Sequence, residues 1–273
     1  MSGTFHLISD KLIADLHLTA AEKYDGYLRQ LATSPYNSQA RLGTVYKPVD
    51  LRASPAGLQT ALRAMESTFG WWDELQDVCP RDVSLVLLDP TAEHGRPHTR
   101  GLHTICVPAT RHWTETSLRT VLSHEAVHLS QKQFPLDWQR ALLAWEFTHI
   151  PVSVTQPSAL FERERLNPDT LVNLGGRFAW RERFIALPLF HSRTAAQATD
   201  NGVGQGVGIY WTQLCHEDCR AECYKQWCPR TARQWNEHPF ESSAYLLPAS
   251  PGVRRTQLLD AFSKRKIIIP PYP

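Results

Sequence analysis

Residues 114–133 read TETSLRTVLSHEAVHLSQKQ, and this stretch decides the expected fold class. Thr114 is a favoured N-cap residue, and apolar residues follow at helical spacing as far as Leu129, so the pattern predicts a helix over 114–133. At about 100° per residue, Glu125 falls inside the apolar arc that includes Leu118. A carboxylate on a core-facing stripe costs several kcal/mol unless it is paired or bound, so the helix is expected to carry an internal site.

The centre of this helix is an H-E-x-x-H motif, His124-Glu125-Ala126-Val127-His128. Residues four apart lie on one face of a helix, so both imidazoles can reach one metal ion. Glu125 stands beside them, where it can orient and deprotonate a water molecule. The motif predicts a zinc hydrolase; a surface helix with an incidental histidine pair is the plain alternative.

Propensity and turn residues predict further elements on both sides of the motif. Val83–Leu88 and His103–Pro108 have the short, apolar and β-branched character of strands, with a polar loop at 93–101 between them. The other expected elements are a helix at 19–32 opened by a Thr19–Glu22 capping box, a helix from Ser54 to Leu75, a helix at 136–149, and strand residues around 178–190.

With this strand-then-helix order and the sequence His124-Glu125-Ala126-Val127-His128-Leu129-Ser130-Gln131, the chain resembles the zincin metallopeptidases. The resemblance implies an α+β fold of zincin type, in which a small mixed sheet packs against the active-site helix. It also implies that a strand at the sheet edge, here around His103–Val107, holds an extended peptide substrate.

A catalytic zinc site normally has three protein ligands, and two carboxylates compete for the third position. After His128 the chain has no Gly or His of the metzincin continuation, so a gluzincin-like arrangement fits better. Glu241, in the Pro-started stretch His238-Pro239-Phe240-Glu241, resembles the pattern of small intracellular zincins and is favoured. Glu146, in the next predicted helix, is the alternative, at a spacing that resembles thermolysin-like enzymes.

Three side chains are candidate donors to an oxyanion: His238, Tyr245 and His191. Each has a structural role as its alternative interpretation. Asn167-Pro168-Asp169-Thr170 reads as a turn or helix start, with a substrate loop as its functional interpretation.

Four thiols lie close together at Cys215, Cys219, Cys223 and Cys228. On a continuous helix the first three would share a face, and Cys228 could fold back to complete a site. A second, structural zinc is one interpretation, and disulfides or free thiols are the others.

Composition limits the other classes of function. With 29 Lys+Arg against 27 Asp+Glu the net charge is +2, which gives no basic excess for nucleic acid. No apolar run approaches 18 residues, so no membrane partner is expected. The opening residues 1–18 lack the basic and apolar regions of a signal peptide, so a cytoplasmic location is expected.

These observations predict one zincin-like α+β domain over 1–273, with a helical N-terminal part at 1–80 and a C-terminal part at 150–273 that closes the cleft. The expected activity is peptide-bond hydrolysis of a peptide or protein substrate, with one catalytic Zn²⁺ and Glu125 as general base. The alternative is a non-catalytic, metal-stabilised interaction protein that uses the cysteines and a surface rich in its 9 Trp.

Overall fold

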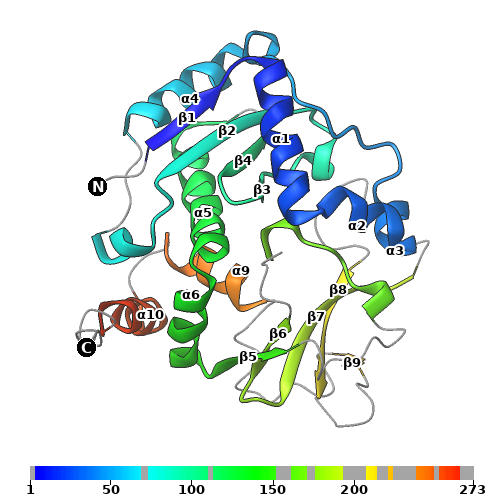
Figure 1. Cartoon of the computed structure of the whole chain (residues 1–273), viewed down its shortest axis with the longest axis vertical. Coiled ribbons are helices and arrows are strands. Elements are labelled where there is room, and N and C mark those ends of the chain that lie inside the picture. Colours follow the sequence, from blue (N-terminus) through cyan, green and yellow to red (C-terminus); the bar gives the residue numbers. More distant parts are fainter. Residues whose placement is uncertain are drawn as a thin grey trace.

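The computed structural model describes residues 4–68, 73–109, 113–151, 161–170, 176–192, 207–213, 221–223, 238–248 and 252–264. The protein is mixed α+β, with two separate sheets (Figure 1). One sheet lies in the upper half of the view and the other in the lower half, and α5 (Glu115–Gln133) runs from the first toward the second.

The upper sheet has the strand order β1-β2-β4-β3. Its strands are β1 (Thr4–Ile8), β2 (Asp82–Leu88), β3 (His98–Arg100) and β4 (Thr104–Pro108). Strands β1, β2 and β4 are parallel, whereas β3 pairs antiparallel with β4. The strands expected at 83–88 and 103–108 are therefore confirmed. The expectation that the second of them forms the sheet edge is wrong, because β3 arises from the segment read as a polar loop.

Helices pack on both faces of this sheet. α1 (Lys11–Asp25) packs on one face, and α4 (Ala56–Thr68) and α5 pack on the other. The same part of the chain also contains α2 (Tyr27–Thr33), α3 (Pro35–Ala40) and short 3₁₀ turns at η1 (Leu51–Ala53), η2 (Asp73–Val78) and η3 (Ala92–Gly95). The core between α4, α5 and the strands contains fully buried side chains such as Leu62, Met65, Leu85, Val107 and Leu122.

The first helix differs from the expected span of 19–32. It begins after Asp10, whose carboxylate accepts hydrogen bonds from the N–H groups of Leu12 and Ile13. It ends at Gly26, whose φ of 58° is left-handed and costs glycine little. The side chain of Glu22 therefore does not form the expected capping box; it accepts hydrogen bonds from the following turn and from Arg100.

The lower sheet is antiparallel in the order β5-β6-β7-β8-β9. Its strands are β5 (Phe147–Pro151), β6 (Gly176–Trp180), β7 (Phe184–Phe190), β8 (Val207–Gln213) and β9 (Ala221–Cys223). The strand residues expected around 178–190 are confirmed. The helix expected over 136–149 is shorter: α6 (Pro135–Leu142) is followed by η4 (Leu143–Trp145), and Glu146 turns the chain into β5 with a φ of 64°.

A second core joins the lower sheet to the end of α5 and to the C-terminal helices. The helices are α9 (Pro239–Leu246) and α10 (Val253–Ser263), and two further turns, η6 (Phe161–Arg163) and η7 (Pro168–Thr170), precede β6. Val127 faces this core whereas Ala126 and Leu129 face the upper one, so the second half of α5 is buried on two sides. Figure 1 shows α9 beside this half of α5.

The tryptophans bear on the alternative of a Trp-rich binding surface. Four of those that the structure describes, Trp138, Trp145, Trp180 and Trp211, are buried in the second core. Trp113 packs partly buried against the first. These five side chains stabilise the interior. None of the described helices has the length and apolar character needed to cross a bilayer.

Candidate metal centre

The structure brings His124, His128 and Glu241 together as one group of potential metal ligands. The Nε2 atoms of the two histidines are 3.1 Å apart, and an oxygen of Glu241 lies 3.6 Å and 3.5 Å from them. Donors about 2.05 Å from a tetrahedral zinc ion would be about 3.3 Å from one another, so the triangle fits such an ion. His124 and Glu241 also line the cavity described below, so an ion held by the three residues would be accessible from it.

Gln131 orients His128 for this role. Its amide nitrogen donates hydrogen bonds to the carbonyl of Phe240 (3.0 Å) and to Oγ of Ser243 (2.9 Å). Its amide oxygen is therefore the atom that lies 2.8 Å from Nδ1 of His128. That oxygen accepts only, so Nδ1 carries the proton and the lone pair of Nε2 points to the metal position.

Glu241 is held in its ionised form. Asn167 donates a hydrogen bond to Oε1, while Oε2 is the atom nearest both histidines. Burial opposes ionisation of Glu241, but the neighbouring histidines outweigh it and hold its pKa well below the usual 4.5. Burial by itself would lower the pKa of His128, but the carboxylate of Glu241 outweighs this effect, so the pKa of His128 is raised above 6.5. Such mutual stabilisation is what a divalent cation would replace.

Glu125 lies buried beside the triad, as the helical wheel predicts, with 4% of its surface exposed. Burial raises its pKa well above 4.5, and the carboxylates of Asp169 and Glu241 raise it further. Its Oε2 has no hydrogen-bond partner among the described groups. An orphaned buried oxygen is costly, and it is therefore available to a water or substrate at this position.

Asp169 reaches Glu125 from η7 and is itself fixed by the edge strand. Its Oδ1 accepts hydrogen bonds from the N–H (2.6 Å) and Oγ1 (2.8 Å) of Thr99. The ammonium group of Lys132 lies 2.7 Å from the same Oγ1. Burial lowers the pKa of Lys132 to about 8, against the opposing charge of Asp169. Glu125, the candidate general base, is thus held in place by a chain of polar contacts that links α5, β3 and η7.

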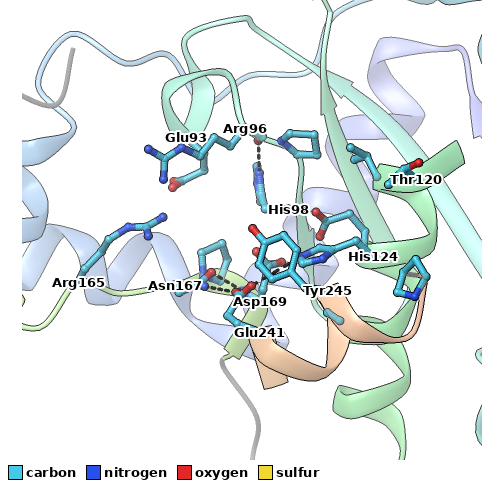
Figure 2. Close-up of a pocket in the computed structure, with 16 residues that line it drawn as sticks. Glu93, Arg96, His98, Thr120, His124, Arg165, Asn167, Asp169, Glu241 and Tyr245 are labelled. Atoms are coloured by element: carbon cyan, nitrogen blue, oxygen red, sulfur yellow. Dashed lines mark hydrogen bonds and ion pairs between the residues drawn. The ribbon is translucent and has the colours of Figure 1, made fainter. Parts of the chain in front are cut away.

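These groups line one cavity of about 410 Å³, a volume typical of small-ligand sites. His124 and Glu241 lie on one side of it beside Tyr245 (Figure 2), and Glu125 also lines it. The opposite side of the view carries Glu93, Arg96 and Arg165. A carbonyl compound entering the cavity can therefore approach the metal ligands and Glu125 together.

The three candidate oxyanion donors have different surroundings. Tyr245, one turn after Glu241 on α9, lines the cavity with its ring centroid 4.4 Å from that of His124. His238 does not line the cavity; its Nδ1 accepts a hydrogen bond from the N–H of Phe240 and caps α9. Burial lowers the pKa of His238 to about 3. His191 lies at the end of β7, where Nδ1 is 2.9 Å from the hydroxyl of Tyr210.

Two other predictions have different outcomes. Glu146, the alternative third ligand, does not join the triad; it is half exposed and forms an ion pair with Arg181 at 2.9 Å. Of the cysteine stretch, Cys215, Cys219 and Cys228 lie outside the described residues. Cys223 lies in strand β9, so a continuous helix over 215–223 is wrong.

Several residues of the site could not be assigned a role from the sequence, or were not assigned one. Gln131 could have been found, because it follows His128 by three residues on the same helix face. Asn167 and Asp169 lie in a segment noted as a possible substrate loop, but no pattern assigned them to Glu241 and Glu125. Thr99 and Lys132 gave no signal, because their contact depends on how α5 crosses β3.

Comparisons of the chain with protein-family models, with curated proteins and with solved structures found no match.

Proposed function

We propose that the protein is a zinc-dependent hydrolase of the zincin type that cleaves peptide bonds. The single observation that carries the proposal is the fit of His124, His128 and Glu241 to one tetrahedral ion, next to the buried carboxylate of Glu125, one oxygen of which has no partner among the described residues. A bound zinc ion acts as a Lewis acid and lowers the pKa of water.

The residues of the chain then divide the work. Glu125 would take the proton of the attacking water and later pass it to the leaving amine, because it lines the cavity beside His124 and its Oε2 has no hydrogen-bond partner among the described groups. Tyr245 is the favoured donor to the developing oxyanion, since it lines the cavity next to His124. Asp169 positions Glu125, and Gln131 and Asn167 position the ligands.

A purely structural metal site is the competing proposal. Such a site is closed by four protein ligands, whereas the described residues supply a group of three beside a cavity. This difference favours the hydrolase.

The test replaces Glu125 by Gln and assays a library of quenched fluorescent peptides with the zinc-loaded protein. We expect zinc content to stay the same and the hydrolysis rate to fall by about 100-fold or more. Glu115→Gln is the matched control, because that carboxylate is exposed near the start of the same helix, where it lies 3.7 Å from Arg119. Full hydrolysis by the Glu125→Gln protein would refute the assignment.

A further inference from the structure

Strand β3 is the edge of the upper sheet nearest to the cavity. On the side that faces away from β4, its backbone groups are already hydrogen-bonded to side chains of other elements. In an antiparallel pair alternate residues face outward, and here Thr99 is the outward residue. Its N–H donates to Asp169 (2.6 Å), and its carbonyl oxygen accepts from Lys132 (3.2 Å). The next outward N–H, that of Gly101, donates to Asp25 at 2.8 Å.

These contacts are not easily displaced by a substrate. Asp169 and Lys132 are both buried, with 7% and 2% of their surfaces exposed. Separating them from Thr99 would leave two charged groups in the interior without their hydrogen bonds, at a cost of several kcal/mol. An extended peptide therefore has no free backbone groups on β3 with which to pair, and the expectation of substrate binding along a sheet edge fails for this strand.

The cavity offers another means of recognition at its far end. Arg96 and Arg165 both line it there, close to the turn η3. Both arginines affect the ionisation of His94 in that turn. Burial lowers the pKa of His94, and the positive charges of Arg96 and Arg165 lower it further.

The carboxylates near Arg165 are already committed to other partners. Glu93 pairs with Arg41 at 2.8 Å, and Glu164 pairs with Arg177. Within the described ranges no carboxylate forms an ion pair with Arg165, whose guanidinium group lies on the cavity side in Figure 2. This end of the cavity is therefore electropositive and has an arginine ready to accept an anion.

We propose that the substrate is a short compound with a carboxylate that Arg165 binds, while its scissile carbonyl lies at the His124/His128/Glu241 end, and that it does not bind as an added strand on β3. The inference rests on the proposed hydrolase function and names its substrate class. The carboxylate can come from a peptide's free C-terminus or from an acidic side chain, and both present the same group to the guanidinium.

The experiment measures binding without turnover. Zinc-loaded Glu125→Gln protein is titrated calorimetrically with pooled N-acetylated tripeptides of Ala, Leu and Phe, as free acids and as C-terminal amides. A second arm compares amidated tripeptides that contain Glu with those that contain Gln. The same titrations are repeated with a double variant that carries both Glu125→Gln and Arg165→Gln. The matched control is the double variant with Glu125→Gln and Arg140→Gln, because Arg140 is an exposed arginine on α6.

We expect the free acids, the Glu-containing amides, or both to bind about tenfold more tightly than their neutral counterparts. Arg165→Gln should remove this difference without changing zinc content or melting temperature, and Arg140→Gln should leave it intact. Equal binding of charged and neutral peptides, a preference that survives Arg165→Gln, or no binding of any peptide overturns the inference.

The native protein is assayed for cleavage of the same peptides. Cleavage with no preference for a carboxylate would refute the inference and leave the proposed hydrolase standing. Arg165-dependent binding without cleavage by the native protein would do the reverse.

Discussion

At the scale of single residues, the orientation of His128 depends on Gln131, and this dependence can be measured. Replacing Gln131 by Ala removes the acceptor for Nδ1–H, so the ring can rotate or adopt the other tautomer. We expect the affinity for zinc to fall by about 10- to 100-fold, as judged by competition with a chromogenic chelator.

Gln133→Ala is the matched control for this change. Gln133 lies two residues further along α5 and donates to the carbonyl of Leu102, away from the metal ligands. Its replacement should leave zinc affinity unchanged. Equal affinities of the Gln131→Ala and native proteins would contradict the positioning role.

The residues found from sequence are those whose relation is local. His124, Glu125 and His128 lie within one helical turn and a residue, so helix geometry alone places them together. The choice between Glu241 and Glu146 could be made only from the structure. The number of residues between the histidines and each glutamate does not define the path of the chain between them. Arg165 and Thr99 were not found for the same reason, since their importance comes from residues far along the chain.

At the scale of elements, three with strong local signals are confirmed, whereas the bounds predicted for the helices at 19–32 and 136–149 are wrong. The helix α5 begins after Thr114 with a capping box to Ser117, β2 spans the apolar run, and α9 starts at Pro239. The missed elements depend on tertiary contacts. β3 is a three-residue polar strand that exists because β4 and Asp169 satisfy its backbone, and no apolar alternation announces it.

The turn η3, which forms the basic end of the cavity, is held by one buried ion pair. Glu93 has a left-handed φ of 47° and accepts hydrogen bonds from Arg41 at 3.0 Å and 2.8 Å. Burial opposes the ionisation of Glu93, but Arg41 outweighs it and lowers the pKa to about 2, from an ordinary 4.5. Because the folded pKa is the lower one, the pair stabilises the fold above pH 4.5, and this contribution is lost as the pH falls toward 2.

Glu93→Gln should therefore lower the free energy of unfolding at pH 7 by about 3 kcal/mol. The difference from the native protein should shrink steadily below pH 4.5, as measured by urea denaturation at a series of pH values. Glu115→Gln, at an exposed position on α5, should change stability by less than about 0.5 kcal/mol. A loss with Glu93→Gln that is independent of pH would contradict the pKa argument.

At the scale of the whole molecule, the candidate metal site is where the two cores meet. His124 and His128 come from α5, which packs on the upper sheet, while Glu241 comes from α9 in the second core. A mixed α+β composition could be predicted from the sequence. The presence of two sheets could not, because pairing among β5 to β9 is set by contacts between segments that show no distinct period.

A metal ion at this junction should stabilise the whole fold, because it binds ligands that only the folded chain brings together. At free zinc 1,000-fold above Kd the gain is about 4 kcal/mol, which corresponds to a rise in Tm of about 10 °C for a chain of this size. We expect Glu241→Gln to abolish most of this rise and to reduce the bound zinc by one ion per chain. Glu146→Gln, at the half-exposed ion pair with Arg181, should change neither quantity. Zinc that remains in the Glu241→Gln protein without raising its Tm would indicate a second site, for which the cysteine stretch 215–228 is the candidate.

If Glu241→Gln leaves both the zinc content and the rise in Tm at their native values, Glu241 is not a ligand.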